Sequence, residues 1–321
     1  MRPARTNRPI TEDAANAFVT TAVRLCKAGV AAEVTSHLLT QCLFCFFAED
    51  VGLLPAKLFE RLVNNRDMRP EVLRSSLQTL FEAMCGGGMF GAESIPWFNG
   101  GLFQTIEVPP LTVMDVAALR NAAVLDRSAI DPSIFGTLFE RGLDPKKRSQ
   151  LGAHYTDPAT IMRLVEPVVQ RPLKAEWERV KDAIAGHVAK SKRSGDAEYR
   201  HTLDAFVGYL EKLREFCVLD PACGSGNFLY LALKCLKDLE HQANIEAEAL
   251  GLQRQVDAST SSANVLGIEI NEYAAELARV TVWIGELQWR LQHGYPFRGE
   301  PDSRAARPDR VPRCVDECGR E

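Results

Sequence analysis

The sequence lacks the features that would place it in a membrane, disulfide-rich or repeat class. It contains no apolar run long enough to span a bilayer, and no signal peptide is found at its start. Its nine cysteines do not have the regular spacing of a disulfide framework, and no internal repeat is found. These absences predict a protein of a reducing, cytoplasmic compartment with no membrane partner.

A strong charge of either sign is also missing. The formal net charge is -4 over 321 residues, so charge alone does not indicate a nucleic-acid binder, although a balanced average can hide a basic face. What is present is an ordinary globular composition, with 46% hydrophobic and 25% charged residues. A chain of this length and composition can form two domains with hydrophobic cores.

Cys42 and Cys45 have the spacing of a CxxC metal motif. They lie in an apolar stretch with helical periodicity, and no second pair of ligands follows nearby. We therefore favour thiols packed in a core over zinc ligands. Cys314 and Cys318 lie near the end of the chain without structural context, so no metal site is predicted.

The first half of the chain shows only helical periodicity. Apolar residues recur at helical spacing over residues 31–48 and again over 72–84, where a run of three glycines at 86–88 ends the pattern. The aromatic segment 95–103 is expected to pack under these helices. A third helix is predicted to start after the Asp131 cap and to end at Gly142. The front of the chain is thus predicted to be all helical.

The next segment also begins with helical signals. Asp157 and Pro158 form a second capped start, and the periodicity continues through Trp177 and Ile184. Residues 190–196 are polar and basic. A solvated loop is the favoured interpretation of this stretch, and a patch that contacts phosphates is the alternative.

The pattern changes to alternating strands and helices after residue 215. Residues 216–219 and 265–270 are short apolar runs typical of buried strands, and helices are predicted over about 227–241 and 272–291. This alternation predicts an α/β fold, in which two strands of a parallel, doubly wound, Rossmann-like sheet are visible behind an all-α N-terminal domain. After Phe297 the chain becomes rich in arginine and proline, and residues 298–321 are expected to be disordered.

Residues 220–228, Asp-Pro-Ala-Cys-Gly-Ser-Gly-Asn-Phe, connect the first predicted strand to its helix. Ligands bind at the carboxyl ends of the strands in such folds. Gly224 and Gly226 allow a tight turn and a close approach to a ligand, while Asp220 supplies a carboxylate. The spacing differs from a dinucleotide GxGxxG, and the lysine of a P-loop is missing. The alternative is a strand-to-helix turn with no ligand.

This segment resembles the S-adenosyl-L-methionine (SAM) motif of adenine-specific DNA methyltransferases, Asp-Pro-Ala-Cys-Gly-Ser-Gly, at every position. The resemblance implies SAM as the cofactor. It implies that the cofactor is bound by residues of the turn and by the first residues of the following helix, namely Asp220, Ala222, Gly224, Ser225, Gly226, Asn227 and Phe228.

Two further segments fit the same family. Glu269 lies at the end of the second predicted strand, where an acidic side chain can accept hydrogen bonds from both ribose hydroxyls of a nucleoside; a plain surface carboxylate is the alternative. Residues 152–158 resemble the motif that precedes the SAM turn and closes over the cofactor, which implies contacts from Tyr155 and Thr156. His154 is interpreted as a local hydrogen-bonding residue. This order of motifs is that of the gamma arrangement of amino-methyltransferases.

The helical front resembles the spacer of MmeI-like single-chain restriction and modification enzymes. The resemblance rests on residues 46–50, 98–103 and 133–141. It implies a spacer domain over residues 1–145 and the N-terminal part of a SAM-dependent methyltransferase domain over residues 146–297. In that family the spacer helps to hold DNA, so double-stranded DNA is the expected partner.

The family motif that holds the target adenine, Asn-Pro-Pro followed by Tyr or Phe, does not occur in the sequence. We therefore expect a DNA adenine-N6 methyltransferase of the restriction-modification type that is truncated before its catalytic motif. No catalytic residue is predicted, and a second polypeptide could carry the catalytic and target-recognition parts. Two alternatives stay open: a SAM methyltransferase with a protein or small-molecule substrate, and a non-catalytic DNA-binding or interaction protein.

Overall fold

The computed structural model describes residues 18, 20–98, 102–123, 156–188, 197–255 and 260–295. They belong to two compact units, one within residues 1–155 and 271–281 and the other within residues 156–270 and 282–321. None of the helices in this described part is both long enough and apolar enough to cross a membrane. The predicted boundary at residues 145 and 146, the predicted helix from Asp131 and the predicted disordered tail lie outside the described residues.

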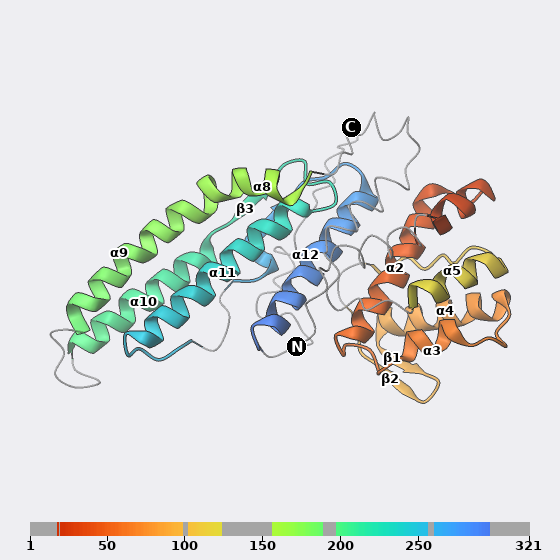
Figure 1. Cartoon of the computed structure of the whole chain (residues 1–321), viewed down its shortest axis with the longest axis horizontal. Coiled ribbons are helices and arrows are strands. Elements are labelled where there is room, and N and C mark those ends of the chain that lie inside the picture. The colour runs from red at the N-terminus through yellow and green to blue at the C-terminus, as the bar shows by residue number, and fades with distance from the viewer. Residues whose placement is uncertain are drawn as a thin grey trace, which may run out of the picture. The chain divides into compact units, whose positions relative to one another are not determined.

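The first unit is mainly helical, and its larger helices follow the predicted periodicity. Residues 20–27 are helical, and the helices α2 (Ala32–Asp50) and α4 (Pro70–Gly86) confirm the two apolar patterns (Figure 1). Three helical segments of this unit were not predicted, namely residues 20–27, α3 (Leu58–Asn64) and α5 (Val113–Ala123).

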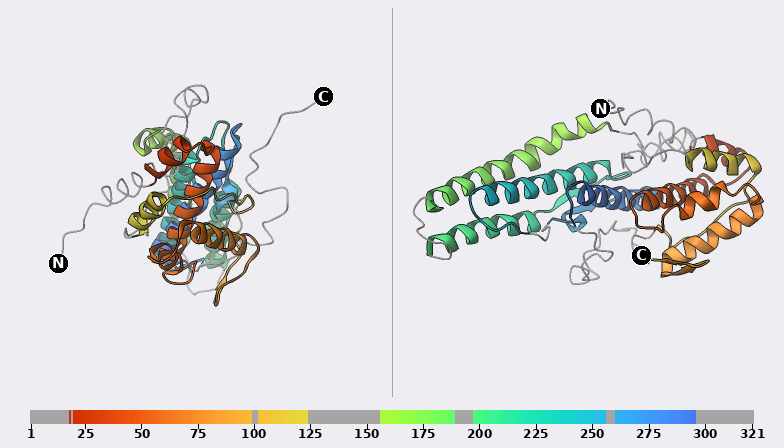
Figure 2. Two further views of the ribbon diagram at one scale, coloured as in Figure 1. Left: turned by 90° about the vertical axis from the view of Figure 1, so that its right-hand side faces the viewer. Right: turned by 60° about the horizontal axis from the view of Figure 1, so that its bottom comes forward.

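The prediction of an all-α front is wrong at one place. After α4 the chain forms an antiparallel hairpin of β1 (Gly88–Phe90) and β2 (Glu93–Ile95), in which Gly88 pairs with Ile95 (Figure 2). Glycines allow both changes of direction, because Gly87 after α4 has φ +72° and Gly91 in the turn between the strands has φ +60°. Backbone angles of this kind are accessible mainly to glycine.

Aromatic side chains of α2 form the centre of the first core. Phe46 packs edge-on against Phe59 at 4.6 Å between ring centroids, and Phe44 lies 5.5 Å from Phe98 and 5.7 Å from Phe103. Phe98 and Phe103 of the predicted segment therefore pack in the core as expected, whereas Trp97 is 48% exposed and residues 99–101 lie outside the described residues.

Cys42 and Cys45 are completely buried in this core. Burial raises the pKa of the Cys42 thiol to about 12 and raises that of Cys45 as well. Both side chains are therefore neutral thiols at physiological pH, and Cys45 Sγ lies 3.5 Å from Met84 Sδ. The predicted packing of these thiols is confirmed.

The carboxylate of Glu49 caps a helix to which it does not belong. The side chain is only 7% exposed and accepts hydrogen bonds from the backbone N–H groups of Phe59 at 2.6 Å and Glu60 at 3.1 Å. Helix α3 begins at Leu58 and has no cap from its own N-cap residue, Lys57. Glu49 thus satisfies donors that the start of α3 would otherwise leave without partners.

Replacing Glu49 by alanine should lower the free energy of unfolding by about 1–3 kcal/mol, because one buried and one partly buried donor lose their acceptor. Urea unfolding followed by circular dichroism measures the change. Glu82→Ala on the exposed side of α4 is the matched control and should change it by less than about 0.5 kcal/mol. Equal losses in both variants would contradict the capping role.

The second unit begins with a long continuous helical segment. It contains α8 (Pro158–Val165), the π-helical turn η1 (Glu166–Gln170) and α9 (Arg171–Val188) (Figure 1). The predicted cap is confirmed, since Asp157 accepts hydrogen bonds from the N–H of Thr160 at 3.1 Å and from its hydroxyl. These bonds also lower the pKa of Asp157.

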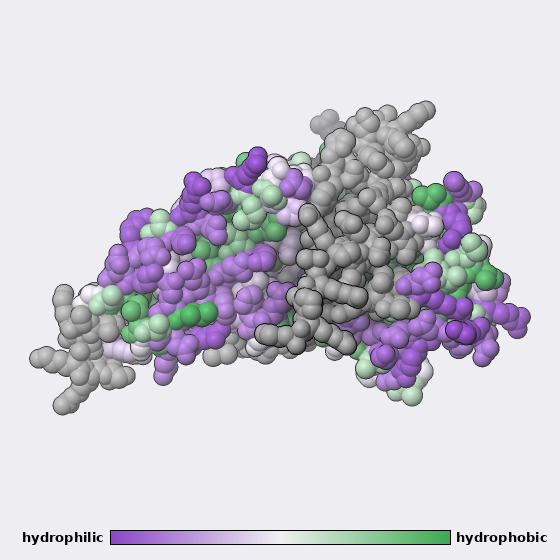
Figure 3. Space-filling view, viewed as in Figure 1, coloured by the Kyte–Doolittle hydropathy of each residue, from purple (hydrophilic) through white to green (hydrophobic). Residues whose placement is uncertain are grey.

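Three helices pack together around Trp177, namely α9, α10 (Ala197–Glu215) and α11 (Asn227–Ala249). The indole ring lies 5.0 Å from Tyr209 and 6.0 Å from Phe206, and its Nε1–H donates to Glu246 Oε2 at 2.8 Å. The outer face of these helices is mostly hydrophilic in Figure 3. The side chains packed between these helices are therefore mainly apolar, with a few polar contacts such as the bond from Trp177 to Glu246.

The two predicted strands are present, but both are shorter than predicted. Strand β3 covers Val218–Asp220 and strand β4 covers Val265–Gly267; they are parallel, with Val218 opposite Val265 and Asp220 opposite Gly267. Val218 and Val265 are buried, whereas Leu219 is 56% exposed. The 3-10 turn η2 (Ser262–Asn264) precedes β4, and α12 (Glu272–Gln292) follows it.

A cluster of aromatic and basic side chains joins His241 of α11 to residues that follow α11 and α12. The ring of His241 lies 4.5 Å from that of His293, and the Nδ1 atom of His241 is 3.4 Å from Arg254 Nη2 and 3.3 Å from the Tyr295 hydroxyl. Burial first, then His293 and Arg254, lower the pKa of His241, while Asp238 acts in the opposite direction.

A histidine whose pKa is lowered by folding favours the folded state most when it is neutral. Stability should therefore fall as the pH drops below the ordinary histidine value of 6.5 toward the lowered pKa of His241. Urea midpoints measured between about pH 7.5 and about pH 5.5 should decrease, and the decrease should be smaller in His241→Gln. The hypothesis fails if the variant and the parent protein lose stability equally over this range.

Candidate functional site

Residues 220–228 form a compact turn at the carboxyl end of β3. The N–H of Ile268 donates to Asp220 O at 2.9 Å, and the N–H of Cys223 donates to Ile268 O at 3.0 Å, so the turn stays paired with the chain that leaves β4. Asp220 also accepts a hydrogen bond from the N–H of Ala222 through its side-chain Oδ1 at 3.0 Å. The acidic residue at the start of the turn therefore shapes the turn itself.

Two glycines give the turn its backbone shape. Gly224 has φ +53° and Gly226 has φ +83°, and Gly226 is the N-cap of α11. A Cβ atom added at Gly224 would have no neighbouring heavy atom within 4 Å. The backbone is thus open on this side, as the approach of a ligand requires.

Glu269 reaches this turn from the other strand. The N–H of Gly224 donates to Glu269 Oε2 at 2.9 Å, although the two residues are 45 positions apart in the sequence. The prediction that Glu269 ends a strand is wrong by two residues, since β4 ends at Gly267. The reason is that the backbone of Ile268 is bonded to Asp220 and Cys223 of the turn.

Close packing under the turn depends on a third glycine. A Cβ atom at Gly267 would lie 2.6 Å from Cys223 Sγ and 2.9 Å from Leu229 Cδ1. Cys223 is 6% and Leu229 is 3% exposed. The side chain of Cys223 can therefore lie against β4 only because residue 267 has none.

Gly267→Ala should lower the free energy of unfolding by about 1–3 kcal/mol, because the new methyl group overlaps two buried side chains. Gly208→Ala is a suitable control, since a Cβ atom at this exposed position in α10 meets no heavy atom within 4 Å. That control should be neutral or stabilising by up to about 1 kcal/mol, as expected for glycine to alanine in a helix. Urea unfolding of both variants checks the prediction, which would be wrong if Gly267→Ala were the more stable of the two.

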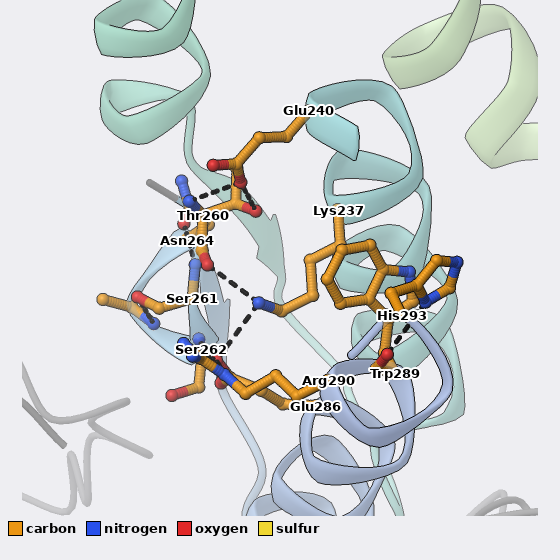
Figure 4. A network of polar contacts seen from close by, with 11 residues as sticks. Lys237, Glu240, Thr260, Ser261, Ser262, Asn264, Glu286, Trp289, Arg290 and His293 are labelled. Carbon is orange, nitrogen blue, oxygen red and sulfur yellow. Dashed lines mark hydrogen bonds and ion pairs between the residues drawn. The ribbon is translucent and has the colours of Figure 1, made fainter. Parts of the chain in front are cut away.

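A buried charge network fixes the start of β4. Lys237 of α11 is fully buried; its Nζ donates to Thr260 O at 2.8 Å and lies 3.2 Å from Glu286 Oε1 (Figure 4). The ammonium also lies 5.2 Å from the centroid of the Trp289 ring, and Glu286 pairs with Arg290 at 3.0 Å. A buried ammonium group is tolerated because Thr260, Glu286 and the Trp289 ring compensate part of its desolvation.

Asn264 connects the starts of the two strands. Its side-chain Nδ2 donates to the carbonyl oxygens of Leu213 at 2.9 Å and Phe216 at 2.8 Å, just before β3. Glu240 of α11 holds the chain before β4 by accepting from the N–H and the hydroxyl of Thr260. These residues fix the starts of both strands. They thereby also set the position of the carboxyl ends of the strands, where the turn and Glu269 lie.

The structure brings together most of the predicted cofactor residues. Asp220, Ala222, Gly224, Ser225 and Gly226 form the turn, and Phe228 is half-buried at the start of α11. Asn227 is 9% exposed, and its Oδ1 has no hydrogen-bond partner.

Of the remaining two predicted residues, Thr156 alone lies within the part of the chain that the structure describes. Thr156 is exposed and lies just before α8, and Tyr155 lies outside the described residues, as do His154 and residues 190–196. In the part of the chain that the structure describes, no three His, Cys, Asp or Glu side chains gather closely enough to hold a metal ion.

The exposure of one residue next to Glu269 was not predicted from the sequence. Ile270 follows Glu269 directly in the chain and is 93% exposed. The sequence pattern assigns Ile270 to the buried strand, because the apolar run continues to it without a break. Its exposure beside an acidic residue becomes visible only once β4 is seen to end at Gly267.

Comparison with known families identifies both halves of the chain. Residues 195–300 match the model of the DNA-methyltransferase domain of MmeI, and residues 33–103 match the model of the helicase spacer domain of MmeI. The chain belongs to the MmeI-like family of restriction-modification methyltransferases. The methyltransferase match contains the turn, both parallel strands and Glu269.

Individual relatives agree with this family. The chain is 28% identical to DNA methyltransferase A of Bacillus subtilis (strain 168) over 270 residues, which cover 78% of this chain and 27% of that protein. It is 27% identical over 303 residues to a type II restriction enzyme and methyltransferase of Methanocaldococcus jannaschii, covering 78% of this chain and 24% of the relative.

A solved structure supports the MmeI-like assignment as well. The Type IIL restriction-modification enzyme MmeI, determined in complex with DNA, superposes with a TM-score of 0.70 at 28% sequence identity. The match covers 88% of this chain and 37% of the MmeI chain. The chain thus spans about a quarter of the length of these two curated relatives and less than half of the solved enzyme.

Proposed function

We propose that this chain is the SAM-binding part of a site-specific DNA adenine-N6 methyltransferase of the restriction-modification type. The observation that carries the proposal is the meeting of the glycine turn with Glu269 at the carboxyl ends of two parallel strands. Ligands of open α/β sheets bind at such strand ends. The second unit is accordingly proposed to be part of a Rossmann-like methyltransferase domain.

The groups at this position fit the parts of SAM. The carboxylate of Glu269 can accept hydrogen bonds from ribose hydroxyls, and the exposed side chain of Ile270 offers an apolar surface to the adenine ring. The open backbone at Gly224 leaves room for the methionine part next to Asp220 and Ser225. When bound there, SAM would supply the methyl group that is transferred.

Adenine as the target base rests on the motif in residues 220–226, which resembles the form found in adenine-specific DNA methyltransferases. The Asn-Pro-Pro motif that holds the flipped adenine is not among these 321 residues, so the proposal assigns cofactor binding, and no catalytic residue, to this chain. Double-stranded DNA is the proposed partner, supported by the DNA complex of MmeI.

Isothermal titration of the full chain with SAM tests the proposal. We expect one SAM per chain, and Asp220→Ala should weaken binding by roughly tenfold or more, because this change removes both a carboxylate and the bond that shapes the turn. Asp204→Ala on the exposed face of α10 is the control and should bind like the parent protein.

Two results would count against a SAM site at the turn. The first is a folded parent protein that binds no SAM, and the second is equal binding by the parent protein and Asp220→Ala. DNA binding is measured separately by filter retention at increasing salt, where a true phosphate interface loses affinity steadily.

A further inference from the structure

The tip of the glycine turn is held by hydrogen bonds and not by packing. Gly224 has φ +53°, and a Cβ atom placed there would meet no neighbouring heavy atom within 4 Å. Glycine in such a backbone conformation loses more conformational entropy on ordering than any other residue. The order of this tip therefore depends on the groups that bind its backbone.

The carboxylate of Glu269 is one of these groups. Backbone pairing between the turn and the chain after β4 includes the bond from Cys223 N–H to Ile268 O at 3.0 Å. The next bond toward the tip is made by a side chain, from Gly224 N–H to Glu269 Oε2 at 2.9 Å. Glu269 thus extends the pairing by one residue, to the point where the backbone becomes open.

We infer that Glu269 is a positioning residue for the glycine turn in addition to its role as a ligand for the ribose, so that the turn is set in its binding shape before the cofactor arrives. The ligand role of Glu269 in this inference rests on the proposed SAM site, whereas the positioning role does not. A carboxylate has two oxygen atoms with about four acceptor positions. One side chain can therefore hold Gly224 and accept bonds from a ligand at the same time.

Changing either the length or the charge of the side chain at position 269 tests the two roles of Glu269 separately. Aspartate keeps the negative charge but moves the carboxylate back by about 1.5 Å, one carbon–carbon bond, which takes it out of hydrogen-bond range of Gly224. Glutamine keeps the length and one acceptor oxygen for Gly224. Its NH₂ group is a donor, so it cannot accept bonds from both ribose hydroxyls.

The experiment compares Glu269→Asp and Glu269→Gln in the full chain with two measurements. The first is the hydrogen-exchange rate of the Gly224 amide without ligand, followed by NMR of the deuterated, ¹⁵N-labelled protein. The second is the dissociation constant of SAM from calorimetry. Glu211→Asp and Glu211→Gln, at an exposed position of α10, are the matched controls.

We expect the Gly224 amide to be protected in the parent protein. It should exchange about tenfold faster in Glu269→Asp and within about threefold of the parent rate in Glu269→Gln. Both variants should bind SAM roughly tenfold more weakly or worse. The Glu211 variants should match the parent protein in both measurements.

Three results would overturn the inference. They are an unprotected Gly224 amide in the parent protein, an unchanged exchange rate in Glu269→Asp, and SAM binding by Glu269→Gln that equals the parent protein's. The third result would leave Glu269 a purely structural residue. If the exchange rates change as expected and the parent protein binds no SAM, the proposed function fails while the positioning role stands.

Discussion

The parallel pairing of β3 with β4 determines the position of every group in the candidate site. Parallel strands cannot be joined by a tight hairpin, so the chain must cross over through a longer connection, here α11 and the segment that follows it. Both strands consequently end at the same edge of the sheet, where the turn and Glu269 meet. Each strand has only three residues, so this pairing needs support from side chains.

That support is polar and buried. Asn264 bonds the chain before β3, and Lys237 and Glu240 bond Thr260, four residues before Asn264. Burial of one face of each strand favours one register, but strands of three residues have few side chains to bury. Hydrogen bonds with fixed donors and acceptors do specify a register. The buried charges therefore stabilise one alignment of the two strands. This alignment costs the desolvation free energy of Lys237 and Glu286.

Much of this arrangement can be predicted from the sequence. Helices α2, α4 and α8 follow apolar periodicity or a capping signal, and the turn at 220–228 is identified by its glycines and its family motif. Helix α10 is not among the predicted elements, since its apolar positions are interspersed with many charged residues. The hairpin after α4 is also missed, because a run of glycines is typical of a simple break.

The site could be predicted as a set of residues but not as a set of bonds. The bond between Gly224 and Glu269 spans 45 positions, and no local pattern encodes it. The exact end of β4 depends on the bonds of Ile268 to the turn, which again come from distant sequence. Exposure of Ile270 follows from that end. Local signals thus predict where the helices and strands lie. Long-range hydrogen bonds determine where these elements end and which side chains meet there.

The cap that Glu49 provides for α3 has a consequence for the order of folding. Helix α3 has seven residues, which is too short to be stable by itself in water. Its first turn is completed by a carboxylate on α2, ten positions before Phe59. The closing loop is short and forms quickly compared with most tertiary contacts. Helix α3 should therefore form as an extension of α2, after that helix has placed Glu49, and should be lost together with it on unfolding.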